Sequence, residues 1–302
     1  MKILISGATG LVGTALVDKL GRQGHTVCRL IRPGGKKVEG AEKGFDVAWN
    51  PETGELGGAG VGPDVVVNLA GAPIAEARWT QERKALLVSS RVDGTRALVN
   101  ALAKMNARPR VFISATAIGI YGNRGDEILT EESQPGDDFL AEVAKKWEAE
   151  ALKAEALGIR VVLARFGIIL AREGGALPAM MGSFRLGLGA RIGKGKQWMS
   201  WVSLEDVVAI LCFAMENNSV RGAVNVVSPQ PAQNAAFTKA LATALHRPAF
   251  LVVPPFVLRL IFGEMAEGML LAGQRVLPSR LEKAGYRFLH SDLSAALQSI
   301  LA

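Results

Sequence analysis

The segment KILISGATGLVGTALVDKL, near the start of the chain, limits the fold more strongly than any other feature. Residues 2–6 form a short apolar run, which predicts a buried strand. The glycine-rich stretch GATGLVG at 7–13 follows at once and opens into a helical pattern. A strand, a glycine turn and a helix in this order are typical of a dinucleotide-binding site in a parallel α/β sheet.

The three spaced glycines of this turn have separate roles in such a site. Gly7 permits a tight turn, Gly10 lets the backbone approach a pyrophosphate, and Gly13 lets the helix pack close to the strand. The helix N-terminus adds free amides and a positive dipole end. We therefore predict that this turn binds a pyrophosphate, with further contacts from Thr9, Leu11 and Val12.

The residues after the second predicted strand, 25–31, indicate which nucleotide is bound. An NAD site places Asp or Glu here to bind the ribose hydroxyls. This chain has Arg32 instead, followed by Lys36 and Lys37. Because a guanidinium matches phosphate geometry, we predict that Arg32 contacts the 2′-phosphate of NADP(H). The two lysines either add to the positive field or form a solvated basic loop.

Strands and helices continue to alternate along the chain. The run DVVVNLAG at 64–71 predicts a buried strand whose carboxyl end leaves room for ribose and adenine, at Asn68, Leu69, Ala70 and Gly71. We predict a helix at 79–104, a strand at 110–115, a helix at 139–158 and a strand at 159–170. This alternation predicts an α/β fold, a doubly wound parallel sheet of the Rossmann type.

The charge of the chain raises the question of nucleic acid as a partner. The net charge is +7 and the pI is about 9.6. Lys and Arg are scattered, however, and there is no basic helix with interleaved aromatic residues. We expect no nucleic-acid partner, and a small anionic ligand accounts better for clusters such as Arg185, Arg191, Lys194 and Lys196.

Other segments bear on location and metals. No run of 18 or more uncharged apolar residues occurs, and MKILISGATG does not have the pattern of a secretory signal. The only two cysteines, Cys28 and Cys212, fit buried small hydrophobes better than a disulfide or a metal pair. We therefore expect a cytoplasmic protein with no membrane partner and no metal site.

Several strings in the chain are specific when taken together: GATGLVG, NLAG, SRVDGT, ISATAIGIYG, KKWEAEA, RFGIIL and FRLGLGARIGKGKQWMSWV. On these strings the chain resembles extended, epimerase-like members of the short-chain dehydrogenase/reductase superfamily over nearly its whole length. Within that superfamily it resembles the atypical epimerase-family proteins that have a short C-terminal extension. The resemblance implies NADP(H) as the cofactor, in agreement with Arg32.

The resemblance also implies further cofactor contacts, position by position. Ile31 would contact the adenosine end, residues 69–70 the ribose, and Ile168 in RFGIIL the nicotinamide ring. Arg91 stands where extended members have an asparagine that faces the cofactor, so a phosphate or the nicotinamide ribose lies within its expected reach. The alternative is a salt-bridged helix arginine.

Active members of this superfamily use a Ser or Thr, a Tyr, and a Lys four residues after that Tyr. Ser114 matches the serine, and Lys145 or Lys146 matches the lysine. Four residues before these lysines stand Ala141 and Glu142, and the whole chain has only two tyrosines. The usual catalytic tyrosine is therefore absent.

Two residues are candidates to replace it. Tyr121 in AIGIYG matches a tyrosine that normally lines the substrate pocket, and it would serve if the pocket is rearranged. Glu142 would serve if desolvation raised its pKa, and the alternative is an exposed ion pair with a neighbouring lysine. The candidate catalytic set is Ser114, Tyr121 and Lys146.

These observations lead to two hypotheses of function. The first is an NADP(H)-dependent oxidoreductase that acts on an unidentified small molecule with an unusual proton donor. The second is a noncatalytic NADP(H)-binding protein that serves as a redox sensor or scaffold.

We predict two regions in the chain. Residues 1–172 form the Rossmann domain, and residues 201–229 return to it. Residues 173–200 and 230–302 form a smaller, mostly helical substrate or lid region. The apolar stretch 263–273, GEMAEGMLLAG, is either a packing face for a second subunit in a homodimer or a substrate lid.

The glycine-rich segment after residue 172 suits a pocket wall. Trp198, Met199 and Trp201 would cover an apolar ligand there, or else pack in the core. In the following helix Ser203 is the predicted N-cap, with Asp206 at the third helical position. The resemblance implies a structural role for Asp206 rather than a place in the site.

Overall fold

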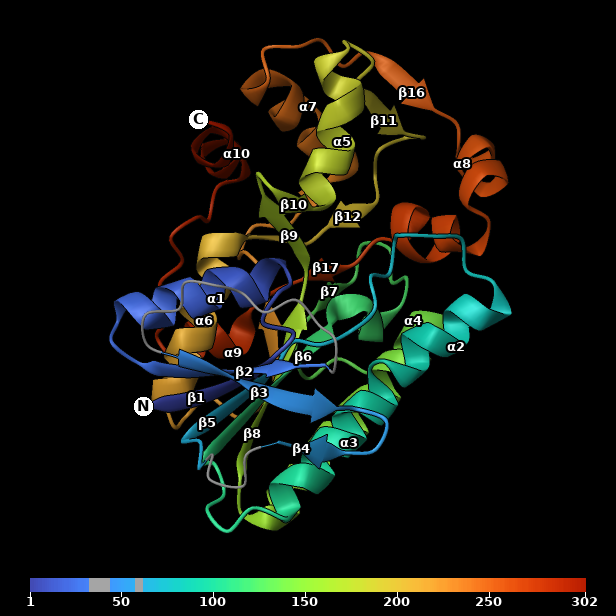
Figure 1. Cartoon of the computed structure of the whole chain (residues 1–302). Coiled ribbons are helices and arrows are strands. Elements are labelled where there is room, and N and C mark those ends of the chain that lie inside the picture. The colour runs from blue at the N-terminus through green and yellow to red at the C-terminus, as the bar shows by residue number, and fades with distance from the viewer. Residues whose placement is uncertain (33–43, 58–61) are drawn as a thin grey trace.

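The computed structural model describes residues 1–32, 44–57 and 62–302 of the chain. Its centre is an eight-stranded sheet in the order β14-β8-β6-β5-β1-β2-β3-β4 (Figure 1). Neighbours are parallel except β3 and β4. This confirms the predicted parallel α/β fold. The strands are β1 (Lys2–Ser6), β2 (Thr26–Ile31), β3 (Gly44–Asn50), β4 (Glu55–Leu56), β5 (Val65–Asn68), β6 (Val111–Ala117), β8 (Arg160–Phe166) and β14 (Gly222–Val226).

Helices cover both faces of this sheet (Figure 1). On one face, α1 (Leu11–Arg22) and α6 (Leu204–Glu216) pack against alternate residues of the central strands. On the other, α3 (Val92–Ala103) and α4 (Phe139–Leu152) pack against the remaining ones. After β1 the chain builds strands on one side, and from β5 onward on the other. The carboxyl ends of β1 and β5 therefore flank the switch point at which such sheets bind ligands.

The helix predicted at 79–104 is in fact two helices, α2 (Gln81–Ser89) and α3. The chain turns at Ser90 and Arg91, where the Ser90 hydroxyl accepts a hydrogen bond from the amide of Ala72. The loop that follows β5 thus fixes the break, which no helical periodicity reveals.

The strand predicted at 159–170 also divides. At Gly167 the chain leaves the large sheet, and β9 (Ile168–Ala171) pairs instead with β10 (Gly174–Gly175) and β13 (Trp201–Ser203). A Cβ at Gly167 would lie 2.4 Å from the carbonyl oxygen of Ser200. The close approach of these two segments therefore requires glycine at this point.

The later part of the chain is largely helical, as predicted, and lies above the carboxyl edge of the sheet (Figure 1). Its core contains Phe184, Trp201 and Phe237, so Trp201 is a core residue. Its elements are α5 (Ala176–Arg185), β11 (Ala190–Ile192), β12 (Trp198–Met199), β15 (Ala232–Gln233), α7 (Asn234–Ala244), β16 (Leu251–Val253), α8 (Pro255–Phe262), the π-helix η3 (Ala266–Leu271) and α10 (Leu293–Leu301). The boundaries of the two predicted regions stay predictions.

Asp206 ties the C-terminal segment to α6. Its amide donates to the Ser203 hydroxyl, as the predicted N-cap requires. Its buried carboxylate accepts from the hydroxyl of Tyr286 and from the amides of Leu289 and His290. Asp206 therefore has the structural role that the sequence indicated.

Two further findings concern membrane spans and metal sites. No helix in the described ranges is long and apolar enough to cross a membrane. Within the same ranges no group of His, Cys, Asp and Glu side chains is arranged to hold a metal ion.

Candidate functional site

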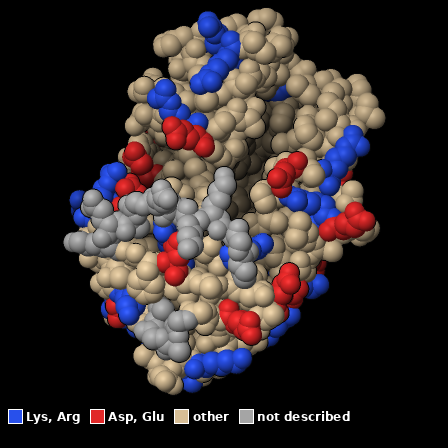
Figure 2. Space-filling view, viewed as in Figure 1, with Lys and Arg blue, Asp and Glu red and all other residues tan. Residues whose placement is uncertain are grey.

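A cleft separates the sheet from the upper, largely helical region. Figure 2 shows the molecule hollowed between them, at the level of the carboxyl edge of the sheet. The predicted glycine turn between β1 and α1 lies at this edge, as do the residues that follow β2 and β5. The cleft is therefore the candidate site.

The glycine turn is shaped by two close approaches. Gly7 has φ +75°, and a Cβ there would lie 2.7 Å from the carbonyl carbon of Leu69. A Cβ on Gly13 would lie 2.1 Å from the carbonyl oxygen of Gly7. Neither position accepts a side chain without moving the backbone, so the turn is held tightly against the segment that follows β5.

The N-terminus of α1 is open to an anion. Gly10 is the N-cap residue, no side chain caps the helix, and its first turn has no acidic residue. Thr9 and Gly10 are exposed, while Leu11 and Val12 are partly buried. Free amides at a positive dipole end fit a pyrophosphate, so the residues present fit a dinucleotide.

Arg32 directly follows β2, after the half-buried Ile31, and is exposed. No ion pair ties it to the described part of the chain, so its guanidinium is available for a ligand phosphate. The two predicted supporting residues, Lys36 and Lys37, lie outside the described residues.

The residues after β5 support the site more than they line it. The buried Asn68 amide donates to the Thr95 hydroxyl at 2.9 Å, which fixes α3 against the sheet. The amide of Leu69 donates to Ser6, and a Cβ on Gly71 would lie 3.4 Å from the Arg91 guanidinium carbon. Leu69 and Ala70 are partly buried and Gly71 is exposed. Their predicted ribose contact stays a prediction.

Arg91 is a largely buried cation beside this segment. Its guanidinium donates to the carbonyls of Leu87 and Ala72 and lies 5.4 Å from the ring centroid of Trp147. Burial, with a smaller contribution from Arg83, lowers the pKa of Arg91 to about 10, so it remains charged at neutral pH. No carboxylate of the described residues forms an ion pair with it, which argues against the salt-bridged alternative.

The lysine helix α4 turns both of its lysines away from its buried face. Lys146 is exposed, and Lys145 forms an ion pair with Glu142 on the outer surface. The hydrogen bond from Lys145 lowers the pKa of Glu142. The raised pKa that a proton-donor role for Glu142 requires is therefore not found, because the carboxylate is solvated and paired, and the alternative of an ion pair is confirmed. Lys146 as a catalytic residue stays a prediction.

An apolar cluster of side chains at the start of α4 was not predicted from the sequence. Leu140 lies beside Gly119, where a Cβ would be 3.4 Å from the Leu140 Cβ. Gly268 in η3 approaches the ring of Trp79, which packs edge-on against Phe139. The stretch 263–273 thus packs on the α2 side of the same chain. The glycines at 119 and 268 were the only sequence signal of these close contacts.

Tyr121 lies in a buried polar network rather than in the cleft. Its fully buried hydroxyl donates to Asn225 Oδ1 at 2.7 Å and accepts from Arg165 at 2.9 Å. Arg165 forms a buried bidentate pair with Glu148, which also accepts from Thr116. Burial raises the pKa of Tyr121. A catalytic role for Tyr121 stays a prediction that requires this network to rearrange.

The two remaining predicted residues lie on strands. Ser114 is fully buried in the middle of the sheet, where it neighbours Asn68 on β5, and its hydroxyl is 3.4 Å from the Ala115 carbonyl oxygen. Ile168 is partly buried at the start of β9, and its amide donates to Ser200. The structure thus brings the predicted cofactor residues of β1, β5 and Arg91 together, but Ser114, Tyr121 and Lys146 do not form one cluster.

Comparison with known proteins finds relatives along the whole chain. The NAD dependent epimerase/dehydratase family matches residues 3–227, and a domain of unknown function (DUF1731) matches residues 253–300. An epimerase family protein of Mycobacterium leprae, ML0860, is 40% identical over 296 residues, which are 98% of this chain and 94% of the relative. Epimerase family protein YfhF of Bacillus subtilis is 39% identical over 310 residues, 100% of this chain and 98% of the relative.

The solved structure of a human relative is similar to this chain over the full length. The crystal structure of human epimerase family protein SDR39U1 (isoform2) with NADPH has a TM-score of 0.87 to this chain at 34% sequence identity. The match covers 100% of this chain and 99% of the human one.

Proposed function

The chain belongs to the NAD dependent epimerase/dehydratase family, and from that premise we propose that it binds NADP(H) and acts as an oxidoreductase on a small molecule. The observation that carries the proposal is the open glycine turn. Its helix has no side-chain cap and no acidic residue in its first turn, and Arg32, at the end of β2, forms no ion pair with the described residues. The human relative's structure contains NADPH, which supports the same choice here.

In this proposal separate residues bind separate parts of the cofactor. The amides that follow Gly10 receive the pyrophosphate, and Arg32 holds the 2′-phosphate. Arg91 supplies a buried positive charge beside Gly71, where a cofactor phosphate compensates it. Burying a cation is costly unless it is paired, so Arg91 favours binding of an anion at this point.

When bound, NADP(H) supplies hydride chemistry, and the chain supplies orientation and exclusion of water. In this proposal Ile168, at the start of β9, contacts the nicotinamide ring, and Leu140, which lies beside Gly119, shields it from water. Ser114 is the assigned partner for a substrate oxygen, which requires local opening because its hydroxyl is fully buried.

A second function, noncatalytic redox sensing, is favoured by a different observation. Both hydrogen-bonding capacities of the Tyr121 hydroxyl are taken up inside the core, and neither lysine of α4 is buried toward the cleft. A site that lacks a free proton donor still binds the nucleotide. In this alternative the chain responds to the ratio of NADPH to NADP⁺.

Titration of the purified chain with NADPH and with NADH, followed by nicotinamide fluorescence, tests the shared part of both functions. We expect wild-type protein to bind NADPH at least about tenfold more tightly than NADH, and Arg32→Ala to abolish most of this difference, since a charge-assisted pair contributes about 1.5–3 kcal/mol. Equal affinities in the wild type would refute the assignment of Arg32. Failure to bind either nucleotide would refute both functions.

A screen of carbonyl compounds then separates the two functions. The oxidoreductase proposal expects NADPH oxidation that Ser114→Ala slows without changing NADPH affinity. The sensor proposal expects no turnover, and hydrogen exchange that differs between the NADPH and NADP⁺ complexes. Turnover that Ser114→Ala leaves unchanged would disprove the role of Ser114.

A further inference from the structure

The positive charge of the chain is concentrated in two segments of the upper region. Residues 174–200 and 230–263 contain no Asp or Glu. The chain has 35 Lys and Arg and 28 Asp and Glu in total, so outside these segments the two signs balance. The two segments contain seven cations, a number that equals the net charge of +7. They are Arg185, Arg191, Lys194, Lys196, Lys239, Arg247 and Arg259.

These cations are largely without acidic partners. Among the described residues only Arg259 forms an ion pair, with Glu267. The other six form none, and all of them except the half-buried Arg191 are exposed. Apart from the paired Arg259, these cations therefore make the surface attractive to an anionic partner.

The same segments also expose most of the large apolar side chains of the molecule. Eight of the thirteen exposed large hydrophobic residues in the described ranges belong to them. Phe250, Leu186 and Leu260 are each more than three quarters exposed, at 77%, 76% and 76%. The remaining five are Leu188, Leu251, Val252, Phe256 and Ile261. So many exposed apolar side chains in one region indicate an interaction surface.

Contacts between the elements make this one continuous surface. β11 pairs with β16 along its length, and a Cβ on Gly189 would lie 2.9 Å from that of Ala249. Gly193 likewise approaches Pro255 at the start of α8. In Figure 2 the part of the surface that corresponds to β16 and α8 has no red atoms. We call the surface formed by the seven cations and eight apolar residues the acid-free face.

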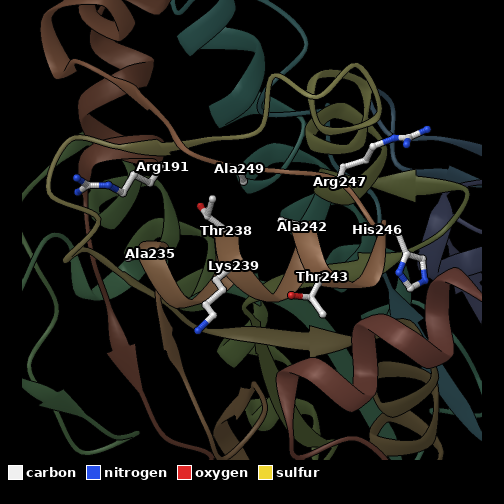
Figure 3. A pocket seen from close by; sticks show the side chains of 9 residues that line it. All are labelled: Arg191, Ala235, Thr238, Lys239, Ala242, Thr243, His246, Arg247 and Ala249. Atoms are coloured by element: carbon white, nitrogen blue, oxygen red, sulfur yellow. The ribbon is translucent and has the colours of Figure 1, made fainter.

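A cavity of about 420 Å³ lies beside α7 within this region. Figure 3 shows Arg191 and Arg247 at its two ends, with their guanidinium groups pointing away from each other toward the rim, and Lys239 and Thr243 between them. Its lining has no acidic residue and includes two threonine hydroxyls, at Thr238 and Thr243. Cations and hydroxyls around an open cavity suit a phosphate group.

We propose that the acid-free face binds the surface of an anionic lipid bilayer, so that the chain is a peripheral membrane protein. The apolar side chains of β16 and α8 enter the interface between headgroups and acyl chains. The surrounding Lys and Arg side chains pair with lipid phosphates, and the cavity beside α7 receives one headgroup. A combination of exposed Phe and Leu with Lys and Arg is the pattern that binds such interfaces.

Other occupants fit the charges less well. Two copies of the acid-free face in a symmetric dimer would bring like charges together, because among the described residues only Glu267 forms an ion pair with any of its seven cations. An acidic protein would satisfy the cations, but protein interfaces are depleted of lysine at their cores, whereas a bilayer accepts both charges and protruding apolar groups. The sequence-based expectation of no membrane partner rested on the lack of a span and did not address surface binding.

Helix α8, which we propose inserts into the bilayer interface, is held to the rest of the molecule by hydrogen bonds and an ion pair. Arg78, in the loop before α2, donates to the carbonyls of Leu260 and Ile261 at the end of α8. Lys84 on α2 forms an ion pair with Glu264. Because these contacts preorganise α8 beside the mouth of the cleft, membrane binding would place the cleft next to the lipid surface.

Flotation of the full chain with vesicles tests this proposal. We expect binding to vesicles of phosphatidylcholine with phosphatidylglycerol, weaker binding at high salt, and little binding to phosphatidylcholine alone. The double variant Lys239→Gln and Arg247→Gln should weaken the partition coefficient by roughly 25-fold, from about 1 kcal/mol per charge. Phe256→Ser with Leu260→Ser should weaken it at least about tenfold, since both side chains lose their burial in the interface.

Matched controls lie elsewhere on the surface. Lys104→Gln removes an exposed lysine after α3, and Leu289→Ser removes a leucine that is 61% exposed. Both should bind vesicles as the wild type does. No binding of wild-type protein to the anionic vesicles, or equal losses in the controls and the face variants, would overturn the proposal. The proposal would also be overturned if the wild type does not bind vesicles but forms a dimer that the double variant Phe256→Ser with Leu260→Ser dissociates. The face would then be an interface between two copies of the chain.

Discussion

The hydroxyl of Tyr121 donates to Oδ1 of Asn225 at 2.7 Å, across 104 residues of sequence. Arg165 donates to the same hydroxyl at 2.9 Å, so the phenol joins η1, β8 and β14 inside the core. In this position, in the short 3-10 helix η1 (Ile118–Tyr121), the hydroxyl stabilises the fold, and a substrate has no access to it.

Tyr121→Phe should lower the free energy of unfolding by about 1–3 kcal/mol, since it leaves a buried amide oxygen and an Arg165 N–H without a partner. NADPH affinity should not change. Urea denaturation and nucleotide titration of the same preparation measure the two quantities. Unchanged stability combined with a large loss of turnover would instead make Tyr121 catalytic.

The two tyrosines of the chain should not titrate normally in the folded protein. Burial raises the pKa of Tyr121, and burial together with the Asp206 carboxylate raises the pKa of Tyr286. Because both folded-state pKa values exceed the unfolded value of about 10, their contribution to stability is complete below that pH and is lost as the pH rises above it.

Tyrosinate absorbance as a function of pH checks this expectation. In concentrated guanidinium chloride both tyrosines should ionise near pH ~10. In the native protein the signal should appear only at higher pH, together with loss of the helical circular dichroism. Ionisation of either tyrosine at the ordinary pH with the fold intact would contradict the structure.

Arg91→Ala should weaken NADPH binding by roughly 10- to 100-fold, because a charge-assisted contact of about 1.5–3 kcal/mol is lost. Arg96→Ala is the matched control on the same helix, since Arg96 pairs with Asp93 and Glu150 away from Gly71. We expect the control to bind NADPH within about twofold of the wild type, because both carboxylate partners of Arg96 lie away from Gly71. Equal affinity of both variants would mean that Arg91 serves only to pack on Trp147.

Gly13→Ala and Gly21→Ala, both in α1, should have opposite effects on stability. At Gly13 the new methyl group meets the carbonyl oxygen of Gly7 at 2.1 Å, so we expect a loss of about 3 kcal/mol and weaker nucleotide binding. At Gly21 a Cβ meets nothing within 4 Å, so the better helix propensity of alanine should stabilise the chain by about 0.5–1 kcal/mol. Thermal unfolding measures both, and a stable Gly13→Ala variant with normal NADPH binding would contradict the tight turn.

The local sequence was enough to predict several elements of the fold. The run at 2–6, the glycine turn and the first helix follow from apolar periodicity and from the backbone freedom of glycine, which are properties of neighbouring residues. Ser203 as an N-cap was predictable for the same reason. A count of two tyrosines was enough to predict that the usual catalytic tyrosine is missing.

Tertiary structure alone decided which side chains meet. The burial of Tyr121 and the break at Arg91 depend on partners that lie on other segments. Tyr121 bonds to residues 44 and 104 positions away, and Ser90 to a residue 18 positions away. The acid-free face likewise exists only because α5, β11, β16 and α8 pack side by side. The sequence determined the phosphate-binding turn, because its constraints are local; packing decided the surroundings of the cleft, because contacts between distant segments are set by the whole fold.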